Sequence, residues 1–428
     1  MKGVVVKEDL TIENFLVIKK GFFEVKSLNV VIGQQAQGKS VIAKLLYFFN
    51  SISDNFIDGI RKNTGKRELD KELVDKFENY FPRYTWDGSS FEIIYRYGDL
   101  EFFLFGRRNA KRKTNVKLTY SRSLSLLYNS KKKIYQKRLE ENSAEVDNEY
   151  DSSIPESMLF REAVVEPLRK GEHGDFFGST IFIPASRSFF ANLQRNIFTF
   201  LSSNIDIDPF LKEFGSLYEF SKKVYGFRFG RGKSRGPREQ IDRAIQAIVG
   251  GSYEYSEEQD WIVTKGNKIN LANASSGQQE ALPMLLTLNV LPARSSQGKT
   301  TSLFIEEPEA HLFPTSQGYI VSVLSMLREE VGLKIFLTTH SPYILSALNN
   351  LIMAYDVVSS GSMGEDEFKK INNGGSPVDY DSVSAFTIDG GVIKSIKDDE
   401  YRMLGGDILD EVSEHFNDVS NKLLLAGE

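Results

Sequence analysis

The sequence contains no cysteine and only four histidines among its 428 residues. Without cysteine the chain has no disulfide bonds, no thiol catalysis and no cysteine-ligated zinc. The histidines are His173, His311, His340 and His415. Four scattered histidines leave little for a histidine-rich metal site, so we expect no zinc centre built from these residue types.

Long apolar runs are also missing, and residues 1–14 lack the basic, apolar and small-residue succession of a signal peptide. We therefore expect a cytoplasmic protein without a membrane partner. The formal net charge of −5 gives no global case for nucleic-acid binding, so a basic surface would have to be local. Apolar residues make up 41% of the chain, which is sufficient for one large domain or two to three smaller ones.

One segment matches the full phosphate-loop pattern GxxxxGK[ST]. It consists of Gly33, Gln34, Gln35, Ala36, Gln37, Gly38, Lys39 and Ser40. The apolar run 27–32 predicts a buried strand before the loop, and the spacing of apolar residues over 42–49 predicts a helix after it. Backbone N–H groups of such a loop cradle phosphate, while Lys39 reaches the β- and γ-phosphates and the Ser40 hydroxyl binds Mg²⁺. This context predicts ATP and Mg²⁺ as ligands.

A second segment, residues 303–309, is an apolar strand that ends in carboxylates. Ligands collect at the carboxyl ends of strands in open α/β sheets. Because side chains alternate along a strand, we assign Glu306 to Mg²⁺, through water, and Glu307 to the attacking water. The alternative is a strand that ends in solvated charge. Aspartate is the commoner residue at the position of Glu306, and the longer side chain bears on the metal geometry.

A third segment, Ser275, Ser276, Gly277 and Gln278, precedes a helix predicted over 279–288. Hydroxyl and N–H groups at a helix N-terminus can receive a γ-phosphate. Within one chain this would duplicate the phosphate loop. The arrangement makes sense if two chains associate head to tail and each Ser-Gly-Gln element closes on the other's nucleotide. The alternative is an ordinary serine N-cap.

His340 follows the apolar strand pattern 335–339 and is predicted to contact the γ-phosphate or the attacking water. A lone histidine at a strand end can also be purely structural. Glu309 and His311 are expected at the subunit contact beside the site. A Ser-Gly-Gln element ahead of an acidic strand, with a histidine one strand later, is the layout of ABC-type ATPases.

The predicted fold class is therefore α/β, an ABC-type P-loop ATPase head with an inserted α/β arm and a short helical C-terminal tail. We expect the head at 1–55 and 176–345, the arm at 56–175, and a C-terminal extension over 346–428 that completes the head and contacts partners. Strands are expected over 10–18, 91–105 and 181–185, a glycine-rich connection over 226–238, and one or two helices over 398–418.

The motifs together resemble the ATPase half of the OLD-type (overcoming lysogenization defect) branch of the ABC superfamily. The resemblance is carried by residues 10–15, 33–40, 183–187, 275–279, 305–312 and 339–342. Members of this branch often carry a TOPRIM nuclease, for which the remaining tail is too short. Asp379 and Asp381 form a DxD-like pair, but no suitable Glu-Gly element precedes them, so we expect no built-in nuclease.

Standalone ATPases of this kind resemble the ATPase subunits of two-gene prokaryotic anti-phage systems, of the PARIS type first and the Septu type second. The resemblance implies a sensor and scaffold that forms a homodimer or higher homo-oligomer through composite ATP sites. It further implies control of a separately encoded effector nuclease, with a nucleic acid or a phage protein as the trigger.

Two other classes remain open. An SMC-like DNA-binding ATPase for repair or chromosome maintenance is one, although the insertion before residue 181 is too short for long coiled coils. Basic runs at 107–117, 131–138 and 228–238 could follow a phosphate backbone, or they could be solvated surface. The motor of a membrane transporter fits poorly, because residues 307–311 depart from the transporter pattern.

Overall fold

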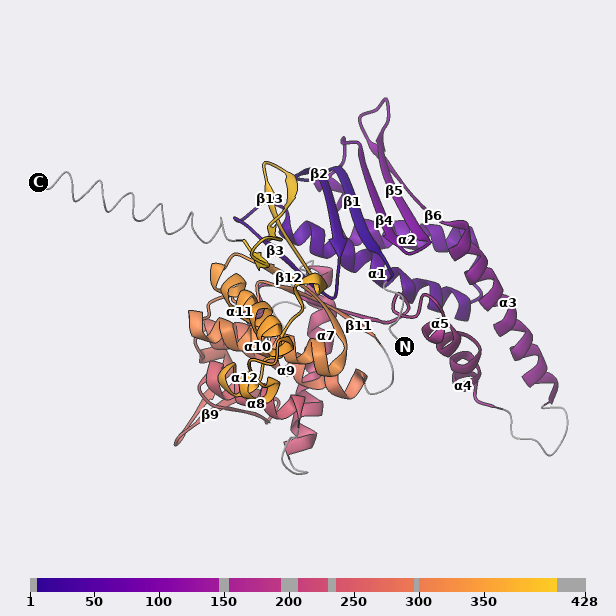
Figure 1. Cartoon of the computed structure of the whole chain (residues 1–428). Coiled ribbons are helices and arrows are strands. Elements are labelled where there is room, and N and C mark those ends of the chain that lie inside the picture. Colours follow the sequence, from indigo (N-terminus) through magenta and orange to yellow (C-terminus); the bar gives the residue numbers. More distant parts are fainter. Residues whose placement is uncertain (1–5, 146–153, 194–206, 230–235, 296–299, 406–428) are drawn as a thin grey trace, which may run out of the picture.

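The computed structural model describes residues 6–145, 154–193, 207–229, 236–295 and 300–405. These residues form a mixed α/β structure around one large sheet, as the sequence predicts (Figure 1). No helix among them is long and apolar enough to cross a membrane.

The large sheet has eleven strands. Their order in space is β6 (Thr114–Tyr120), β5 (Leu100–Arg108), β4 (Phe91–Tyr97), β1 (Glu8–Phe15), β2 (Ile18–Val25), β14 (Val392–Ser395), β13 (Val383–Asp389), β3 (Leu28–Ile32), β12 (Leu333–Thr339), β11 (Thr301–Glu306) and β7 (Ser179–Ile183). Two small sheets accompany it. They contain β8 (Ser252–Ser256), β9 (Gln259–Thr264) and β10 (Asn267–Asn270), and β15 (Lys397–Asp398) and β16 (Met403–Leu404).

The sheet changes character along its width. From β6 to β2 neighbouring strands are antiparallel, whereas β13, β3, β12, β11 and β7 run parallel. The registers Thr339↔Ile32 and Thr387↔Ile32 bring the ends of β12 and β13 level with the end of β3. The carboxyl ends of all five parallel strands therefore meet along one edge, which is the edge where open α/β sheets bind ligands.

Helices cover both faces. They are α1 (Lys39–Arg61), α2 (Lys66–Tyr80), α3 (Arg122–Glu145), α4 (Glu156–Phe160), α5 (Glu166–Lys170), α7 (Pro209–Phe229), α8 (Pro237–Val249), α9 (Ser276–Ser295), α10 (Pro314–Val331), α11 (Pro342–Ser359) and α12 (Glu365–Ile371). Figure 1 shows α8 to α12 grouped together, away from β4, β5, β6 and α3.

Two hydrophobic cores result from the alternation of side chains along the parallel strands. Val30 and Ile335 face the core formed with α7 to α11, whereas Val31 and Phe336 face the core formed with α1 and α2. The predicted apolar face of α1 lies in the second core and is fully buried. It consists of Ile42, Leu45, Leu46 and Phe49.

Three sequence expectations need correction. Residues 10–18 form a hairpin of β1 and β2 rather than one strand, with Leu16 at φ 54° in the turn. Residues 397–404 form the β15–β16 pair rather than a helix, because they hydrogen-bond strand to strand; residues 406–428 lie outside the described part. The boundary at residue 55 falls inside α1, and the segment 56–175 supplies β4, β5 and β6 to the common sheet.

The remaining strand predictions agree with the structure in kind. The run 91–105 contains β4 and part of β5, and 181–185 contains the end of β7. The connection 226–238 joins the end of α7 to the start of α8, and its residues 230–235 lie outside the described part.

Candidate nucleotide site

The phosphate loop connects β3 directly to α1, which begins at Lys39. Gly38 has a φ of 101°, a conformation that favours glycine, and a Cβ added there would lie 2.8 Å from Cγ2 of Val17. The glycine is therefore required both by the turn and by the hairpin beneath it. The positive end of the 23-residue helix α1 points at the loop, as anion binding requires.

Lys39 joins the loop to the next strand. Its Nζ donates to the carbonyl oxygens of Gly33 (2.8 Å) and Gln34 (2.6 Å), and it lies 3.3 Å from Nδ1 of His340. Burial lowers the pKa of Lys39, while the charges of Glu307 and Glu309 act in the opposite direction. The amine is thus already held at the mouth of the loop.

His340 bridges Lys39 and Glu307. A lysine ammonium can only donate, so Nδ1 of His340 accepts and its Nε2 carries the proton. This Nε2 lies 3.0 Å from Oε1 of Glu307 and donates to it. The three residues therefore form one hydrogen-bonded chain across the edge of the sheet, which brings together the two sequence-predicted catalytic residues and the loop lysine.

Glu306 is buried at the end of β11, and its Oε2 accepts from the N–H of Ala185 at 3.3 Å. Its Oε1 has no hydrogen-bond partner among the described residues. Burial raises the pKa of Glu306, and Lys44 and the Ser40 hydroxyl lower it. An unpartnered buried carboxylate oxygen close to a serine hydroxyl fits Mg²⁺, which prefers oxygen ligands and keeps several waters.

Glu307 stands in a strained conformation, with a φ of 44°. A non-glycine residue in this region costs roughly 1–3 kcal/mol and persists only where surrounding contacts hold it. Its N–H donates to the carbonyl of Thr338 at 2.9 Å, and its side chain is partly exposed. The strain turns the carboxylate away from the strand line toward His340, where it can orient or deprotonate a water molecule.

Glu309 acts within this chain. It is buried, and its Oε1 accepts from the Thr339 hydroxyl (2.6 Å) and the His340 N–H (2.7 Å). Burial raises its pKa, which those hydrogen bonds lower. The expectation that Glu309 lies at a subunit contact is wrong, because its carboxyl group faces inward and holds the backbone of His340. His311 is exposed, as that expectation requires.

Arg187 was not assigned a role from the sequence, although it follows a predicted core strand. Its side chain is 0% exposed and donates to the carbonyl oxygens of Pro184, Glu280, Glu306 and Glu307. The sequence signals were its place shortly after a predicted strand and within the segment 183–187 that carries the family resemblance. Burial depth, which decides its role, cannot be seen in a single sequence.

The Ser-Gly-Gln element lies at the start of α9. Ser275 and Gln278 cap each other: the Ser275 N–H donates to Oε1 of Gln278 at 2.9 Å, and the Gln278 N–H faces the Ser275 hydroxyl at 3.4 Å. Ser276 is exposed. Within the described residues, no hydrogen bond or ion pair joins this element to loop 33–40.

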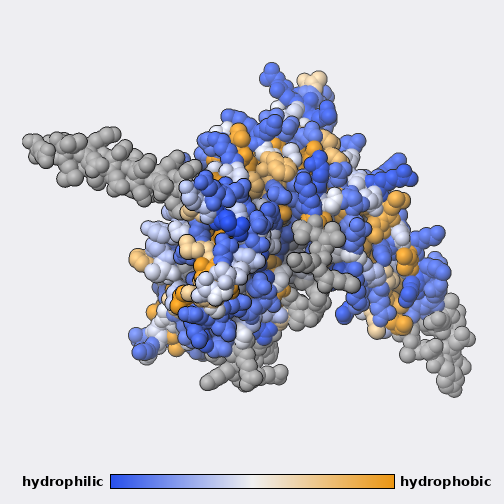
Figure 2. Space-filling view, viewed as in Figure 1, coloured by the Kyte–Doolittle hydropathy of each residue, from blue (hydrophilic) through white to orange (hydrophobic). Residues whose placement is uncertain are grey.

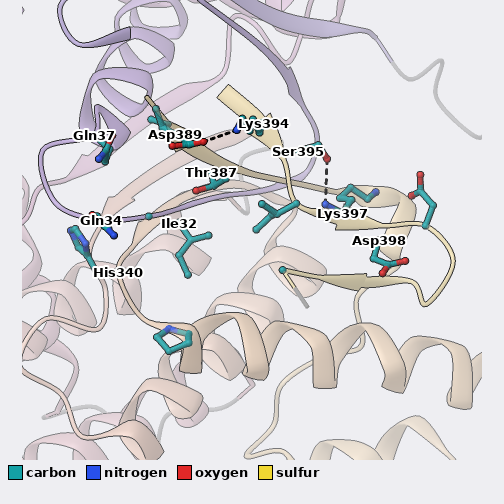
Figure 3. Close-up of a pocket in the computed structure, with 16 residues that line it drawn as sticks. Ile32, Gln34, Gln37, His340, Thr387, Asp389, Lys394, Ser395, Lys397 and Asp398 are labelled. Carbon is teal, nitrogen blue, oxygen red and sulfur yellow. Dashed lines mark hydrogen bonds and ion pairs between the residues drawn. The ribbon is translucent and has the colours of Figure 1, made fainter. Parts of the chain in front are cut away.

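A cavity of about 950 Å³ adjoins the loop and was not predicted from the sequence. Figure 3 shows Gln34 and Gln37 of the loop and His340 on one side, with Thr387, Asp389 and Lys394 of β13 and β14 behind them. Asp389 and Lys394 form an ion pair at 2.6 Å. Strands from the far end of the sequence thus complete the surroundings of the loop, and a cavity of this size can hold a small molecule.

Residues 70–345 match the AAA ATPase domain family, so the chain belongs to that family. The protein is thus an ATPase of the AAA type. The matched segment begins after the phosphate loop and includes the Ser-Gly-Gln element, both acidic residues and His340. No curated protein matches the chain.

Among solved structures, the chain is similar to the SMC head domain from Thermotoga maritima at 10% identity and a TM-score of 0.35, covering 92% of this chain and 99% of that one. The recombination mediator RecF, of the RecFOR pathway, gives 14% identity, a TM-score of 0.35, and coverage of 92% and 98%. The Smc head domain from Pyrococcus furiosus, bound to the C-terminal domain of ScpA, has 8% identity and a TM-score of 0.39. That match covers 96% of this chain and 99% of the other.

Proposed function

We propose that this protein is an ATP-binding and ATP-hydrolysing sensor and scaffold subunit of a prokaryotic anti-phage system. In this proposal it dimerises through composite ATP sites and controls a separately encoded effector nuclease. The observation that carries the ATPase part is the hydrogen-bonded chain from Lys39 through His340 to Glu307. That chain places a phosphate-binding cation and a carboxylate on opposite sides of one histidine.

Each residue then has a defined task. The loop N–H groups and Lys39 hold the β- and γ-phosphates, and Ser40 with Glu306 would hold Mg²⁺, which neutralises the charge that develops on the phosphate oxygens. Glu307 orients the attacking water and accepts its proton, and His340 donates from Nε2 and keeps Glu307 in place. These tasks are mainly positioning and electrostatic stabilisation, as phosphoryl transfer requires.

Dimerisation is supported by the placement of α9. The exposed N-terminus of this helix has no hydrogen bond or ion pair to its own loop in the described part of the chain, yet the Ser276 hydroxyl and the positive end of the helix suit a γ-phosphate. A two-fold dimer would bring each α9 to the loop of the other chain, and both sites would form together.

A separate effector is supported by the contacts that the acidic pair in the C-terminal region makes. Asp379 and Asp381 each lie 3.8 Å from Arg402, and Asp379 caps a turn by accepting from the Asp381 N–H. Within the described residues no group of three or more acidic or histidine side chains could hold a metal ion. The two carboxylates thus flank one arginine, which favours a structural role for the pair. The anti-phage role itself rests on the family resemblance.

The test uses Glu307→Gln. The isosteric amide keeps the hydrogen bond from His340 but cannot accept a proton, so ATP should bind and persist. We expect a dimer or larger assembly with Mg-ATP by light scattering, hydrolysis lowered at least about 100-fold, and no such assembly with the double variant Lys39→Ala, Glu307→Gln. An unchanged assembly size together with full hydrolysis would refute the proposal.

The effector part needs a second measurement. The purified chain should cleave neither DNA nor RNA with Mg²⁺ or Mn²⁺, and its expression alone should not stop growth. Co-expression with the product of the neighbouring gene should yield a complex that an infection or a phage protein dissociates. Metal-dependent cleavage by the pure chain, lost on changing Asp379 and Asp381, would contradict this part.

A second candidate function is nucleic-acid binding, which one surface favours. The hairpin of β5 and β6 carries six exposed cations, and none of them forms an ion pair within the described chain. They are Arg107, Arg108, Lys111, Arg112, Lys113 and Lys117. The hairpin projects beyond the sheet, and Figure 2 shows mostly hydrophilic residues at its tip. Such a cluster can follow a phosphate backbone although the whole chain is acidic.

Fluorescence anisotropy with duplex DNA at several salt concentrations tests this candidate. Replacing Lys111 and Lys113 with Glu should weaken binding and lower the log–log salt slope by about one per lost phosphate contact. Lys170→Glu with Arg243→Glu changes the net charge equally at exposed, carboxylate-paired positions outside the basic runs and serves as the control. Equal effects of the two pairs would remove the hairpin from consideration.

A further inference from the structure

Arg187 lies where the pairing of β7 with β11 ends, on the side of β11 that faces β7. The ladder between β7 and β11 ends at the pair Ile183–Ile305. Beyond it, Nη1 of Arg187 donates to the carbonyl of Glu306 at 2.8 Å, and Nη2 donates to that of Glu307 at 2.9 Å. The guanidinium therefore continues the strand's hydrogen bonding into the strained segment that carries the water-orienting carboxylate.

The same arginine is fixed to the helix of the Ser-Gly-Gln element. The carboxylate of Glu280, on the first turns of α9, accepts from the N–H groups of Arg187 (2.9 Å) and Ser188 (3.1 Å). The backbone carbonyl of Glu280 accepts from Nε of Arg187 at 3.0 Å, and the two side chains form an ion pair at 3.5 Å. Arg187 and Glu280 are both buried, so the contact between α9 and the carboxylate segment is direct and dry.

We propose that Arg187 is a positioning residue that fixes the backbone of Glu306 and holds Glu307 in its strained conformation and, through Glu280, makes that arrangement depend on the position of α9. The inference rests on the proposed function. In a dimer with shared sites, α9 touches the nucleotide of the partner, whereas Glu307 acts on the nucleotide of its own loop. The Arg187–Glu280 pair would therefore connect the two ATP sites within each subunit.

The chemistry of the contact requires arginine. Four carbonyl oxygens from three separate segments surround the guanidinium. A planar fork with five fixed N–H groups can serve them together, whereas a lysine has three donors at one point and cannot span the set. Ser186, next to Arg187, also has a positive φ of 61°, so the backbone on both sides of the contact is bent to bring the groups together.

The experiment compares Arg187→Lys and Glu280→Gln with the parent and with Lys222→Met. Lys222 is equally buried, pairs with Asp260 on the β9 strand and touches none of the site residues, so its loss matches the destabilisation without the positioning effect. Glu280→Gln keeps the size and shape of the side chain, and it remains informative if Arg187→Lys does not fold.

Two readouts separate positioning from a merely structural role. For Arg187→Lys we expect kcat to fall by about 10- to 100-fold while the Kd for a non-hydrolysable ATP analogue changes less than about threefold. Hydrogen exchange of the peptide covering 305–312 should become about 10-fold faster or more. Glu280→Gln should shift both readouts in the same direction and by less, and Lys222→Met should shift neither.

The outcomes distinguish this inference from the proposed function. If the parent hydrolyses ATP and Arg187→Lys has the kcat of the parent or of Lys222→Met, the positioning role is overturned while the ATPase stands. If the parent does not hydrolyse ATP, the proposed function fails, and the exchange measurement still decides the inference. Faster exchange of 305–312 in Arg187→Lys and Glu280→Gln alone upholds it, and unchanged exchange overturns it.

Discussion

The two halves of the proposed ATP site are built differently within one chain. The loop half is already assembled: Lys39 is held by two loop carbonyls and His340, which in turn holds Glu307. The α9 half is exposed, and its Ser275 and Gln278 satisfy each other. One half is completed by strands of the same chain, and the other presents an exposed helix N-terminus to the surroundings. In the proposed dimer, nucleotide would therefore bind to the loop half before α9 of the partner subunit reaches it.

Replacing Lys39 with Ala attacks the assembled half and should have the largest effect. The variant loses the charge at the phosphates and the donor that sets the tautomer of His340, so hydrolysis should fall by at least about 10²- to 10³-fold. The far-ultraviolet circular dichroism spectrum should stay that of the parent. Parental ATP turnover by the purified variant would show that the loop is not the phosphate site.

Mixing variants tests whether the α9 half serves the other chain. Ser276→Glu places a negative charge against phosphate but suits a helix N-terminus, so the fold should survive. Lys39→Ala and Ser276→Glu should each be nearly inactive alone. After subunit exchange half of the dimers are mixed and each keeps one intact site, so up to about a quarter of parental activity should return. No recovery despite demonstrated exchange would mean strictly coupled sites or no shared sites; nucleotide trapping by the mixed dimer separates the two.

Gly277 belongs to the α9 half of the site, but it is required by the packing of α9 within its own chain. A Cβ at this position would lie 2.7 Å from the carbonyl oxygen of His311. Gly277→Ala should therefore lower the free energy of unfolding by about 1–3 kcal/mol in urea titrations. Gly318→Ala, in the interior of α10 with open space around it, is the matched control and should be neutral or stabilising. A fully stable Gly277→Ala would contradict the packing described for α9.

The smallest expected effect concerns pH. Burial raises the pKa of Glu309 above 4.5, so its stabilising contribution is complete below pH 4.5 and is lost as pH rises through the higher folded-state pKa. Relative to Glu309→Gln, the parent should thus lose stability between pH 4.5 and neutral pH. Thermal unfolding of both proteins at pH 5 and pH 8 measures the change. If the stability difference between the parent and Glu309→Gln is the same at both pH values, the pKa of Glu309 is not raised in the folded protein.

Local patterns in the sequence predicted the parts of the site that are contiguous in the chain. The loop, its strand and the apolar face of α1 follow from spacing alone, and so do the acidic end of β11 and the histidine after β12. Arg187 and the strands around 387–399 could not be found this way, because their roles arise from neighbours far away in sequence. The hairpin turn at residue 16 was not recognised because it falls within the apolar run 15–18, which fits the end of one strand as well as a turn between two.

Glu309 and Ser276 differ in burial, and a single sequence does not reveal this difference. Ser276 belongs to the Ser-Gly-Gln element and Glu309 follows the acidic pair, and from the sequence we assigned both to contacts between subunits. Periodicity indicates which residues share a face but not whether that face is covered, since covering depends on elements from elsewhere in the chain. Glu309 is buried beneath His340, whereas Ser276 remains exposed.

The strand order of the large sheet also bears on synthesis. Strand β3, which leads into the phosphate loop, has β12 and β13 as its two neighbours, and these strands are some 300 and 355 residues later in the chain by the pairs Ile335↔Leu28 and Val383↔Leu28. At about 5–20 residues per second, a ribosome needs roughly 15–70 s to make the intervening chain. Until then the loop strand has neither partner. A nascent or truncated chain that lacks β12 and β13 would therefore carry the phosphate-loop sequence without a working site, and the site would form only after β13 has been made.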